Sequence, residues 1–592
     1  MKRKFKGLLL FLFVSLFNII LVNAEVNLKE CEYSEEYLSW TLLNDSEKEN
    51  TIMPFMCKSN YLNSNTSIRS NNSNYTNSSY SLVDLNHVSA VKNQKTTESC
   101  WAFSTIDSIE SNLLKKGVNS LNLSPAHIEL STQRTIFNPI RHTFNRAINV
   151  GGNYLVSSAY LLNNWGPIIE TPRYSIDNLV NLINRNSSIT ASIVENEKAI
   201  YNVKDINFMV NASCTNQAKE DIKKYLVTNG ALSTAVYWSD FTNEAVINNK
   251  VLKDKFRNGP YYHYDASSYF NMSNETIPAN QSTNHAVTIV GWDDNISKSN
   301  FSIQPYNDGA WLIKNSYGTS YFENGEEIFK MGDDGYFYIS YEDVNVCTML
   351  AGFYNIENDV SDNAYYHDPL GWNSEVELPS TVSEIYLGSV FNTKSGSKEK
   401  LDRVTFGTSQ IGQKYTVYYA PNGSLKNYEN NIIGTGIVDH LGYTSITINN
   451  KEISTDKFSI IIKLEAPQEE RIVFPISSKI PDSWWSNTPV ISNVSYLLDN
   501  DGWADTAEIS VINSIRAYTT NSTGSYENTN SEIENSGNIN LLSNSDETLL
   551  EDQNFSNPQT GLKNYNLTFI ISLILISVFT IKLKKLNFFK II

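Results

Sequence analysis

The chain has 592 residues, and its 46 Lys and Arg against 63 Asp and Glu give it a formal net charge of −17. At about 100 to 200 residues per domain this length predicts three to five domains, and the hydrophobic fraction of 41% excludes a wholly disordered chain. The acidic balance argues against a nucleic-acid partner, since gripping a phosphate backbone needs clustered basic residues.

The N-terminus is typical of a secretory signal peptide, which we place at residues 1–24. Lys2, Arg3 and Lys4 precede an apolar run from Leu8 to Val22, and small residues follow up to a cleavage point after Ala24. A first transmembrane helix is the alternative, but the run has about 15 residues and crossing a bilayer takes about 20.

The next two segments precede the region with chemical motifs. Residues 25–58 carry a short helical pattern between Cys31 and Cys57, and residues 59–80 have the composition of an Asn/Ser-rich linker. The chain has five cysteines, so at least one of them is unpaired within the chain.

Cys100 lies at the start of a predicted helix. Apolar residues then recur at helical spacing, at Phe103, Ile106, Ile109 and Leu113. The free N–H groups and the dipole of a helix N-terminus stabilise a negatively charged sulfur, which lowers the pKa of a thiol from about 8.5. Taken alone, such a cysteine is more often a small buried apolar residue.

The segment around Cys100 resembles the active-site region of papain-like cysteine proteases. Ser99-Cys100-Trp101 matches the second half of the family motif Cys-Gly-Ser/Ala-Cys-Trp/Tyr, and Gln94 lies where the family keeps an oxyanion-hole glutamine. Thr97-Glu98 replaces the first half, and Asn149 stands where the bridge partner of the missing cysteine would lie. The loss of both halves of this bridge favours a bridge-free branch of the family.

The downstream partners occur in family order. His285 opens a β-forming run, and Asn315 follows another. A lone His or Asn at such places usually serves packing or a turn, but all three contexts together are hard to obtain by chance. The separations from Cys100 exceed the family's roughly 130 to 150 residues, which we attribute to insertions at 176–214 and 293–308.

The resemblance implies a mechanism. His285 would take the proton of Cys100, Asn315 would orient the imidazole, and Gln94 with the Cys100 N–H would bind the oxyanion. It implies protein or peptide substrates and no metal or organic cofactor, and the sequence has no His or Cys cluster with zinc-ligand spacing.

The same resemblance implies a substrate cleft. Glycines without a Cβ would let substrate backbone approach, although glycines also end helices and open turns. Residues 233–236 would help wall a second subsite, and an aromatic side chain at 317 would shield the His–Asn pair, where the family usually has Trp. The candidate substrate-binding residues are Gly151, Gly152, Ala286, Trp101 and Tyr317.

Residues 346–518 predict an all-β fold. Short β-prone runs between Gly, Asn and Pro turns are typical of a β-sandwich or jelly roll. Asp368-Pro369-Leu370-Gly371-Trp372-Asn373 and Asp501-Gly502-Trp503 resemble the lectin-like domain of clostridial surface cysteine proteases. A Trp of such a domain could stack on sugar, but a buried Trp is commoner. The acidic turn from Asp499 to Asp505 could hold calcium, although a solvated turn is commoner.

The C-terminal end carries an ordered set of segments. A polar spacer at 519–556 precedes Asn557-Pro558-Gln559-Thr560-Gly561, an apolar run from Leu567 to Ile581 and a basic tail. This order resembles a Gram-positive cell-wall sorting signal, with Asn557 in place of the usual Leu. The resemblance implies that a sortase cuts between Thr560 and Gly561 and joins the chain to peptidoglycan. A simple membrane anchor is the main alternative. A lipid-anchor signal of the eukaryotic kind fits less well, because its hydrophobic tail normally ends the chain and this one continues into lysines. With the sorting signal we also expect a transient membrane insertion of the C-terminal segment.

These observations predict an architecture and a function. The fold would be an α+β papain-like, two-lobed protease domain at 81–345, with a helical lobe and a β-barrel-like lobe, followed by the lectin-like sandwich. The function would be that of a secreted, wall-attached cysteine endopeptidase whose partners include sortase, peptidoglycan and cell-surface glycans. A surface adhesin that retains an inactive protease scaffold is the alternative, which the intact set of four residues disfavours.

Two further expectations concern the N-terminal segment and the cysteines. Residues 25–58 would act as an inhibitory pro-region, and a protein starting at Ser81 that was no more active than the longer form would contradict this. With Cys100 as the nucleophile, four cysteines remain, and the sequence does not choose among their three pairings.

Overall fold

The computed structural model describes residues 77–522, apart from gaps at 135–143, 186–196, 212–213, 238–259, 261, 264–282, 302–303, 324–325, 395–397, 468–469 and 500–501. It also describes the backbone of Lys29–Glu30. The predicted signal peptide, most of the linker, most of the spacer and the sorting signal with Thr560 and Gly561 lie outside the described residues. Among the helices within the described ranges, none is long and apolar enough to cross a membrane.

Helices of the first half surround a buried central helix, α4. They are α4 (Cys100–Lys115), α5 (Pro125–Thr132), α6 (Tyr154–Leu162), α7 (Ile176–Asn184) and α8 (Asn216–Asn229), with short 3-10 turns η2 (Pro172–Tyr174) and η5 (Lys298–Asn300). The side chains of Ser124, Asn153 and Thr215 cap α5, α6 and α8 by accepting first-turn N–H groups. All residues of α4 from Cys100 to Leu113 are buried, which confirms the predicted helix.

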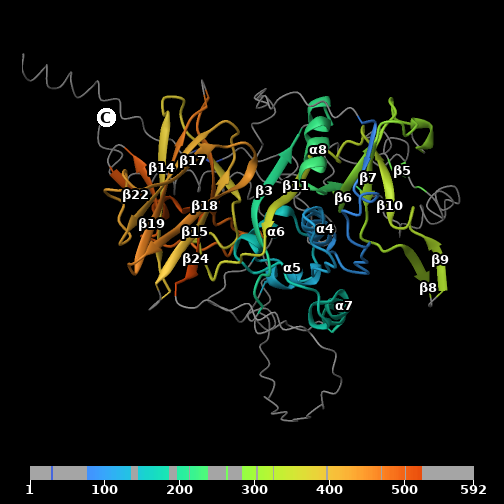
Figure 1. Cartoon of the computed structure of the whole chain (residues 1–592), viewed down its shortest axis with the longest axis horizontal. Helices are drawn as coiled ribbons and strands as arrows, with labels where there is room; N and C mark the ends of the chain where they lie inside the picture. Colours follow the sequence, from blue (N-terminus) through green and yellow to red (C-terminus); the bar gives the residue numbers. More distant parts are fainter. Residues whose placement is uncertain are drawn as a thin grey trace, which may run out of the picture. The chain divides into compact units, whose positions relative to one another are not determined.

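A sheet packs against α4, which contacts β6 and β11 (Figure 1). Its strands are β2 (Ser79–Ser81), β3 (Asn202–Val210), β4 (Leu232–Val236), β5 (Tyr262–His263), β6 (His285–Asp293), β7 (Ala310–Lys314), β10 (Tyr336–Ser340) and β11 (Met349–Glu357). The order is β3-β11-β4-β6-β7-β10-β5, with β2 on β6, and β8 (Ser320–Glu323) and β9 (Glu326–Lys330) form a separate hairpin.

The expected β-barrel-like lobe is corrected to an open sheet. The described strands run from β5 to β3 without closing on themselves. The reason is that the far edge of β3 pairs with a strand of the second half. β11, which lies beyond the predicted boundary at 345/346, pairs with both β3 and β4, so the sheet continues across that boundary.

The second half is a β-sandwich, as predicted. One sheet has the order β17-β16-β19-β14-β21-β22 and is built from β14 (Glu384–Asn392), β16 (Lys414–Pro421), β17 (Ile432–Ile437), β19 (Lys457–Glu465), β21 (Ser495–Asp499) and β22 (Gly502–Asp505). The facing strands are β12 (Asn363–Tyr365), β15 (Glu399–Thr408), β18 (Leu441–Ile453) and β24 (Ile515–Asn521). Apolar side chains from both sheets form one core, among them Leu387, Val404 and Ile460.

A smaller sheet and a turn complete the described elements. They are β13 (Ser374–Glu377), β20 (Val473–Ser478) and β23 (Val511–Asn513), with β1 (Lys29–Glu30) paired to β13, and the 3-10 turn η6 (Thr506–Ile509). The pairing of β1 places part of the predicted pro-like segment against the second half of the chain.

One sheet runs through both halves of the chain. β18 pairs with β3 through Leu441, Gly442 and Tyr443, which lie opposite Phe208, Asn207 and Ile206 in turn. The Tyr518 hydroxyl also donates to the Leu162 carbonyl at 2.6 Å across the same junction. The second half of the chain is therefore joined to the first by backbone hydrogen bonds and does not merely follow it through a linker.

The tryptophan motif of the second half lies in this junction. Trp372 is 8% exposed and packs edge-on against Phe208 at 5.7 Å between ring centroids. Asp368 forms a fully buried ion pair with Arg516 at 2.9 Å. Trp503 is partly buried and donates its indole N–H to the Leu425 carbonyl at 2.8 Å. Trp372 is thus a buried core residue, as most tryptophans are, and not an exposed ring that could stack on sugar.

A disulfide joins Cys214 and Cys347, with 5.1 Å between their Cα atoms. It settles one of the open pairings and links the chain just after β3 to the chain just before β11. Cys100 is the free cysteine of the described residues, whereas Cys31 and Cys57 lie outside them.

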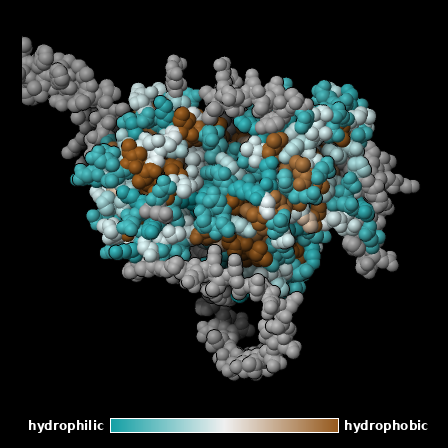
Figure 2. All heavy atoms as spheres, viewed as in Figure 1, coloured by the Kyte–Doolittle hydropathy of each residue, from teal (hydrophilic) through white to brown (hydrophobic). Residues whose placement is uncertain are grey.

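Most large apolar side chains of the described residues lie in internal cores. The face in Figure 2 is mainly teal and white, with separate brown patches. Ile432 and Ile437, on the free edge strand β17, are exceptions at 55% and 56% exposed.

Replacing Gly442 by Ala should weaken the junction between the halves. Gly442 has a φ of +118°, and a Cβ there would lie 2.1 Å from the Ile206 carbonyl oxygen of β3. Because that neighbour is backbone, it cannot rotate away. We expect Gly442→Ala to lower the free energy of unfolding in urea by about 1–3 kcal/mol from this clash, in addition to the strain of its φ.

Gly502→Ala is the matched control for that variant. Gly502 has a similar φ of +123°, but nothing lies within 4 Å of the place that its new methyl group would take. It should show the φ strain without the clash. Equal losses in the two variants would contradict the importance of the close approach between β18 and β3.

Candidate active site

Cys100 is the first residue of α4 and is 4% exposed. Burial raises the pKa of its thiol to about 12, and the backbone N–H of Ala286 acts in the opposite direction by hydrogen bonding to the sulfur. The nearby Glu98 carboxylate adds to the rise, while the N–H groups of Trp101 and Cys100 itself lower the pKa. Since Ala286 directly follows His285, the thiol lies beside the residue predicted to be its base.

His285 and Asn315 form a hydrogen-bonded pair. His285 begins β6, and Asn315 follows the last residue of β7, which pairs with β6. The His285 Nε2 lies 2.9 Å from the Asn315 Oδ1, which also accepts the Ser316 N–H at 2.8 Å. Because Oδ1 accepts, Nε2 carries the hydrogen in the neutral ring and Nδ1 is left as the base.

Burial lowers the pKa of His285 to about 4. The hydrogen bond that His285 donates to Asn315 acts to raise this pKa, and the charge of His263, a buried histidine on β5, acts to lower it. Near neutral pH this low pKa keeps the imidazole of the folded protein uncharged, as a general base must be before it accepts a proton.

Tyr317 covers the imidazole. Its ring stacks on His285 with 4.8 Å between centroids and an interplanar angle of 20°. Its hydroxyl lies 3.4 Å from the His285 Nδ1, and Tyr317 also forms an isolated β-bridge with Asn93. An aromatic side chain thus occupies the position expected to shield the His–Asn pair.

Gln94 is held beside this pair by three hydrogen bonds. Its backbone N–H donates to the Ser316 carbonyl at 2.7 Å, its Oε1 accepts from the Ser316 hydroxyl at 2.6 Å, and its Nε2 donates to the Thr97 carbonyl at 2.6 Å. A primary amide has two N–H hydrogens, so one remains for a substrate oxygen. Ser316, which orients both Gln94 and Asn315, was not singled out from the sequence.

Trp101 packs against the segment that contains Gly151 and Gly152, which we call the glycine segment, and is shielded from solvent. It is fully buried, and a Cβ on Gly152 would lie 2.2 Å from its indole. The Arg146 guanidinium lies over the same ring at 5.0 Å from the centroid. Because Gly152 packs directly on Trp101, no larger residue fits at position 152. The burial of Trp101 argues against its direct contact with substrate.

Arg146 and Glu129 hold the glycine segment from behind, and sequence reasoning missed both. They form a fully buried ion pair at 3.0 Å, and the Arg146 Nη1 donates to the Val150 carbonyl at 2.7 Å and the Gly151 carbonyl at 3.4 Å. No sequence pattern linked two residues so far from the catalytic motifs.

A hydrogen bond joins the two segments that lack the family's bridge. The Glu98 N–H donates to the Asn149 Oδ1 at 2.8 Å, and the Asn149 N–H donates to the Glu129 Oε1 at 2.9 Å. Asn149 has a φ of 60°, a conformation that Asn tolerates better than most residues. The paired loss of the bridge positions in the sequence was the available indication.

Ala286 is buried and lies opposite Ala235 of β4. The structure therefore brings Cys100, His285, Asn315, Gln94 and Tyr317 together through the contacts above, with Ala286 directly behind the thiol. The roles of Ala286, Gly151 and Gly152 in binding substrate stay predictions.

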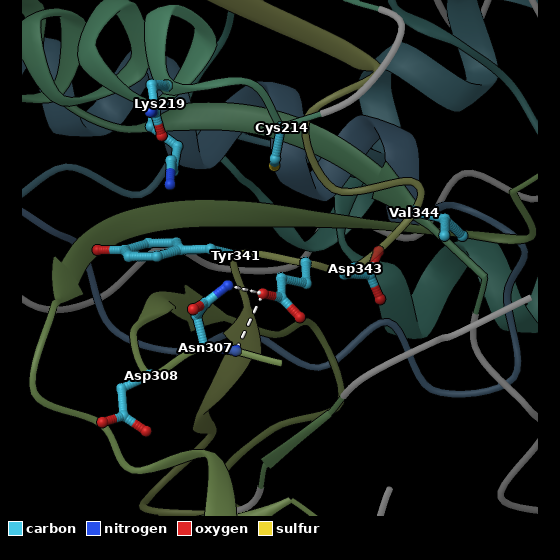
Figure 3. A pocket seen from close by; sticks show the side chains of 9 residues that line it. Cys214, Lys219, Asn307, Asp308, Tyr341, Asp343 and Val344 are labelled. Carbon is cyan, nitrogen blue, oxygen red and sulfur yellow. Dashed lines mark hydrogen bonds between the residues drawn. The ribbon is translucent and has the colours of Figure 1, made fainter. Parts of the chain in front are cut away.

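A cavity of about 600 Å³ lies elsewhere, next to the disulfide (Figure 3). Cys214, Lys219 and Tyr341 line it, and its Glu342 carboxylate accepts hydrogen bonds from the backbone of Tyr306 and from Asn307. The proposed catalytic residues are not among those that line it. Among the described residues, no group of three or more His, Cys, Asp and Glu is placed to hold a metal ion.

Two segments of the chain match known protein families. Residues 77–132 match the papain family cysteine protease, and residues 364–519 match the lectin-like domain. The first match contains Gln94 and Cys100, and the second begins within β12. The chain therefore carries a papain-family cysteine protease domain followed by a lectin-like domain.

Solved structures share this arrangement. The cysteine protease and lectin-like domains of Cwp84, a surface layer associated protein of Clostridium difficile, are 24% identical, with a TM-score of 0.65 over 84% of this chain and 99% of that one. A clostridial Cwp84 variant after propeptide cleavage is 23% identical, with a TM-score of 0.59 over 75% of this chain and 100% of that one. No curated protein matches the chain.

The burial of His285 should make the stability of the fold depend on pH. Its pKa is about 4 in the folded protein against 6.5 for an ordinary histidine, so the unfolded chain binds more protons between these values. Stability should fall as the pH is lowered through this window, by up to about 3 kcal/mol relative to His285→Gln. Urea unfolding of both proteins at several pH values measures this difference.

His440 provides a control of opposite sign. Burial acts to lower the pKa of His440, but Asp439, whose Oδ1 lies 2.7 Å from the His440 Nδ1, and the charge of Asp205 raise it overall. The contribution of His440 to the free energy of unfolding should be present below about pH 6.5 and lost as the pH rises above it.

If the free energies of unfolding of the wild type and of His285→Gln changed with pH in parallel, the burial of an uncharged His285 would be contradicted.

Proposed function

We propose that this chain is a secreted cysteine endopeptidase that hydrolyses peptide bonds with Cys100, His285, Asn315 and Gln94. The observation that carries the proposal is the contact chain at the start of α4. The Cys100 sulfur accepts the N–H of Ala286, and the neighbouring His285 is fixed by Asn315 at 2.9 Å. The papain-family match around Cys100 supports the same reaction class.

The first step of the proposed mechanism is proton transfer. The His285 Nδ1 takes the thiol proton, which leaves a thiolate and an imidazolium side by side. The Asn315 Oδ1 accepts the N–H of Nε2 in both charge states of the ring, so the imidazole keeps its orientation while it gains the proton. Tyr317, stacked on the ring, limits the access of water to the ion pair.

The second step is attack of the sulfur on the substrate carbonyl. The C–S bond forms as the carbonyl π electrons move to oxygen, and the Cys100 N–H and the free amide hydrogen of Gln94 stabilise the oxyanion. The imidazolium of His285 then gives its proton to the leaving amine, and the C–N bond breaks. Water, activated by the neutral imidazole, hydrolyses the thioester and restores the thiol.

We also propose that the chain is attached covalently to the cell wall. The order of Asn557-Pro558-Gln559-Thr560-Gly561, apolar run and basic tail supports cutting by a sortase between Thr560 and Gly561 and transfer to peptidoglycan. The similar Cwp84 is described as a surface layer associated protein, which is compatible with a cell-surface location for this chain. Glycans are candidate partners of the lectin-like domain, although the burial of Trp372 removes one stacking surface for sugar.

Cleavage of an unstructured protein such as casein tests the catalytic proposal. Cys100→Ala should abolish cleavage, because no sulfur is left to form the acyl intermediate. Gln94→Ala should lower kcat by about 10²- to 10³-fold, because one oxyanion donor is lost. Circular dichroism of each variant verifies that it is folded. Equal cleavage by Cys100→Ala and the wild type would remove the assignment of Cys100 as the nucleophile. A folded wild type that cleaved nothing would favour the alternative of an adhesin with an inactive scaffold.

Mass spectrometry of the protein released from purified walls tests the attachment. The C-terminal peptide should end at Thr560 and carry a peptidoglycan fragment, and Thr560→Ala should lose it. Thr568→Ala, a threonine in the apolar run, is the matched control and should be processed normally. A mature chain that extended beyond Gly561 would favour a membrane anchor instead.

A further inference from the structure

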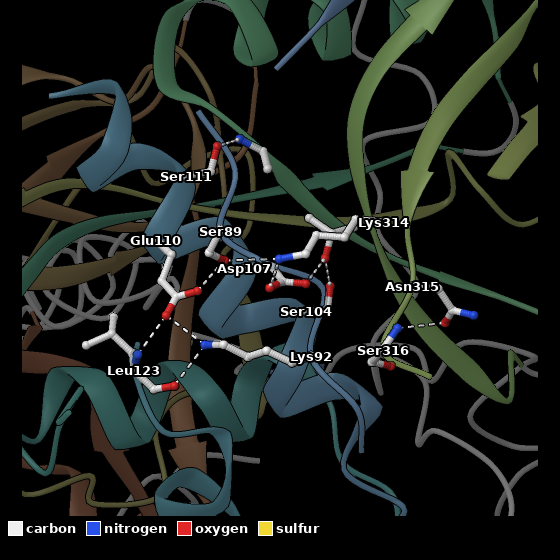
Figure 4. Close-up of polar contacts among 12 residues, drawn as sticks. Ser89, Lys92, Ser104, Asp107, Glu110, Ser111, Leu123, Lys314, Asn315 and Ser316 are labelled. Atoms are coloured by element: carbon white, nitrogen blue, oxygen red, sulfur yellow. Dashed lines mark hydrogen bonds and ion pairs between the residues drawn. The ribbon is translucent and has the colours of Figure 1, made fainter. Parts of the chain in front are cut away.

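Four charged side chains meet in the core behind the catalytic residues. Asp107 and Glu110 project from one face of α4, and Lys92 and Lys314 reach them from neighbouring segments (Figure 4). The side chains of Asp107, Glu110 and Lys314 are 5%, 0% and 1% exposed. The mechanism proposed above uses none of them.

Asp107 contacts both strands that carry the base and its orienting residue. The Lys314 Nζ donates to the Asp107 Oδ1 at 2.7 Å, and Lys314 directly precedes Asn315 at the end of β7. The Thr288 hydroxyl, three residues after His285 on β6, lies 3.4 Å from the Asp107 Oδ2 and 3.2 Å from the Ser104 hydroxyl. Two helical turns before Asp107, the same helix begins at Cys100.

Glu110 makes the corresponding contacts with the segment of Gln94. Its Oε1 accepts from the Lys92 Nζ at 2.7 Å, and Lys92 lies two residues before Gln94. Its Oε2 accepts from the Ser89 hydroxyl, which in turn accepts from the Lys314 Nζ at 3.0 Å. The two arms of the cluster are thus one connected network.

We propose that Asp107 is a positioning residue of the active site, which sets the distance between the Cys100 thiol and the His285–Asn315 pair through its ion pair with Lys314. This inference rests on the proposed function. α4 carries the thiol, whereas β6 and β7 carry the imidazole and the amide. Displacements of about 1 Å at reacting groups can lower a rate by about a hundredfold, so a rigid link between these elements acts on catalysis.

The chemistry of the pair suits a positioning role better than a purely stabilising one. A buried ion pair is often no more stable than apolar residues of the same shape, because both charges are removed from water. The hydrogen bonds of the ion pair are directional, however, so they are formed in only one arrangement of α4 and β7. The charged groups that face Asp107 are Lys314, Lys92 and Glu110, two cations with one further carboxylate.

The test compares the wild type with Asp107→Asn, which keeps the shape and removes the charge. We expect kcat on a peptide substrate to fall by about tenfold to a hundredfold, with KM changed by no more than about twofold. Alkylation of Cys100 by iodoacetamide, followed by mass spectrometry of its peptide, should show a rate that rises at higher pH than in the wild type. The reason is that a displaced imidazole stabilises the thiolate less well.

Asp368→Asn is the matched control. It also replaces one carboxylate of a buried ion pair, with Arg516 at 2.9 Å, but the pair lies in the lectin-like half. It should lower the unfolding temperature and leave the alkylation profile of Cys100 at its wild-type position. If Asp107→Asn also left kcat per folded molecule and that profile unchanged, the positioning role would be overturned.

A milder variant keeps the proposal testable where Asp107→Asn does not fold. Thr288→Val removes the hydroxyl contacts to Asp107 and Ser104 and leaves the ion pair intact. It should shift the alkylation profile in the same direction by a smaller amount, and an unshifted profile would count against the proposal. A wild type that cleaved no peptide would overturn the proposed function itself, whereas an active wild type matched by Asp107→Asn would overturn only the positioning role.

Discussion

The placement of α4 between the helices and the sheet is the constraint on which the rest of the structure depends. The helix is buried from Cys100 to Leu113, so its polar side chains must find partners inside the protein. Asp107 and Glu110 find them in Lys314 and Lys92, and Ser104 donates to the Val287 carbonyl of β6 at 2.7 Å. The contacts that satisfy these buried groups also bring the Cys100 thiol to the strands that carry its proposed base and the amide beside it.

A second constraint joins the lectin-like half to the protease half. The pairing of β18 with β3 makes their sheets continuous, and the disulfide between Cys214 and Cys347 links the chain near the ends of β3 and β11. β3 therefore pairs on one edge with β11, which precedes the lectin-like match, and on the other edge with β18, which lies within that match. A domain joined in this way is tied to the sheet that carries His285 by backbone pairing, which a polar linker would not provide.

The proposed catalytic residues could be found from the sequence, but the residues that hold them in place could not. The motifs around Cys100, His285 and Asn315 are local, and each combines residue types that a known chemistry requires. The supporting contacts are not local: Arg146 meets Glu129, and Asn149 meets Glu98, through side chains whose partners no periodicity specifies. The same holds for β3, which the sequence placed within an insertion and which forms the strand shared by both halves.

Burial favours the neutral forms of Cys100 and His285 before the reaction, but it strengthens the attraction between their charged forms during the proposed reaction. It raises the pKa of Cys100 and lowers that of His285, so each group taken alone prefers its neutral form. The proposed proton transfer between them would create two opposite charges in one site, and their attraction would be strong because little water screens it. That attraction falls as the groups move apart. A buried active site of this kind therefore depends on the distance between α4 and β6 more than an exposed one would, and the charged side chains behind it lie where they can fix that distance.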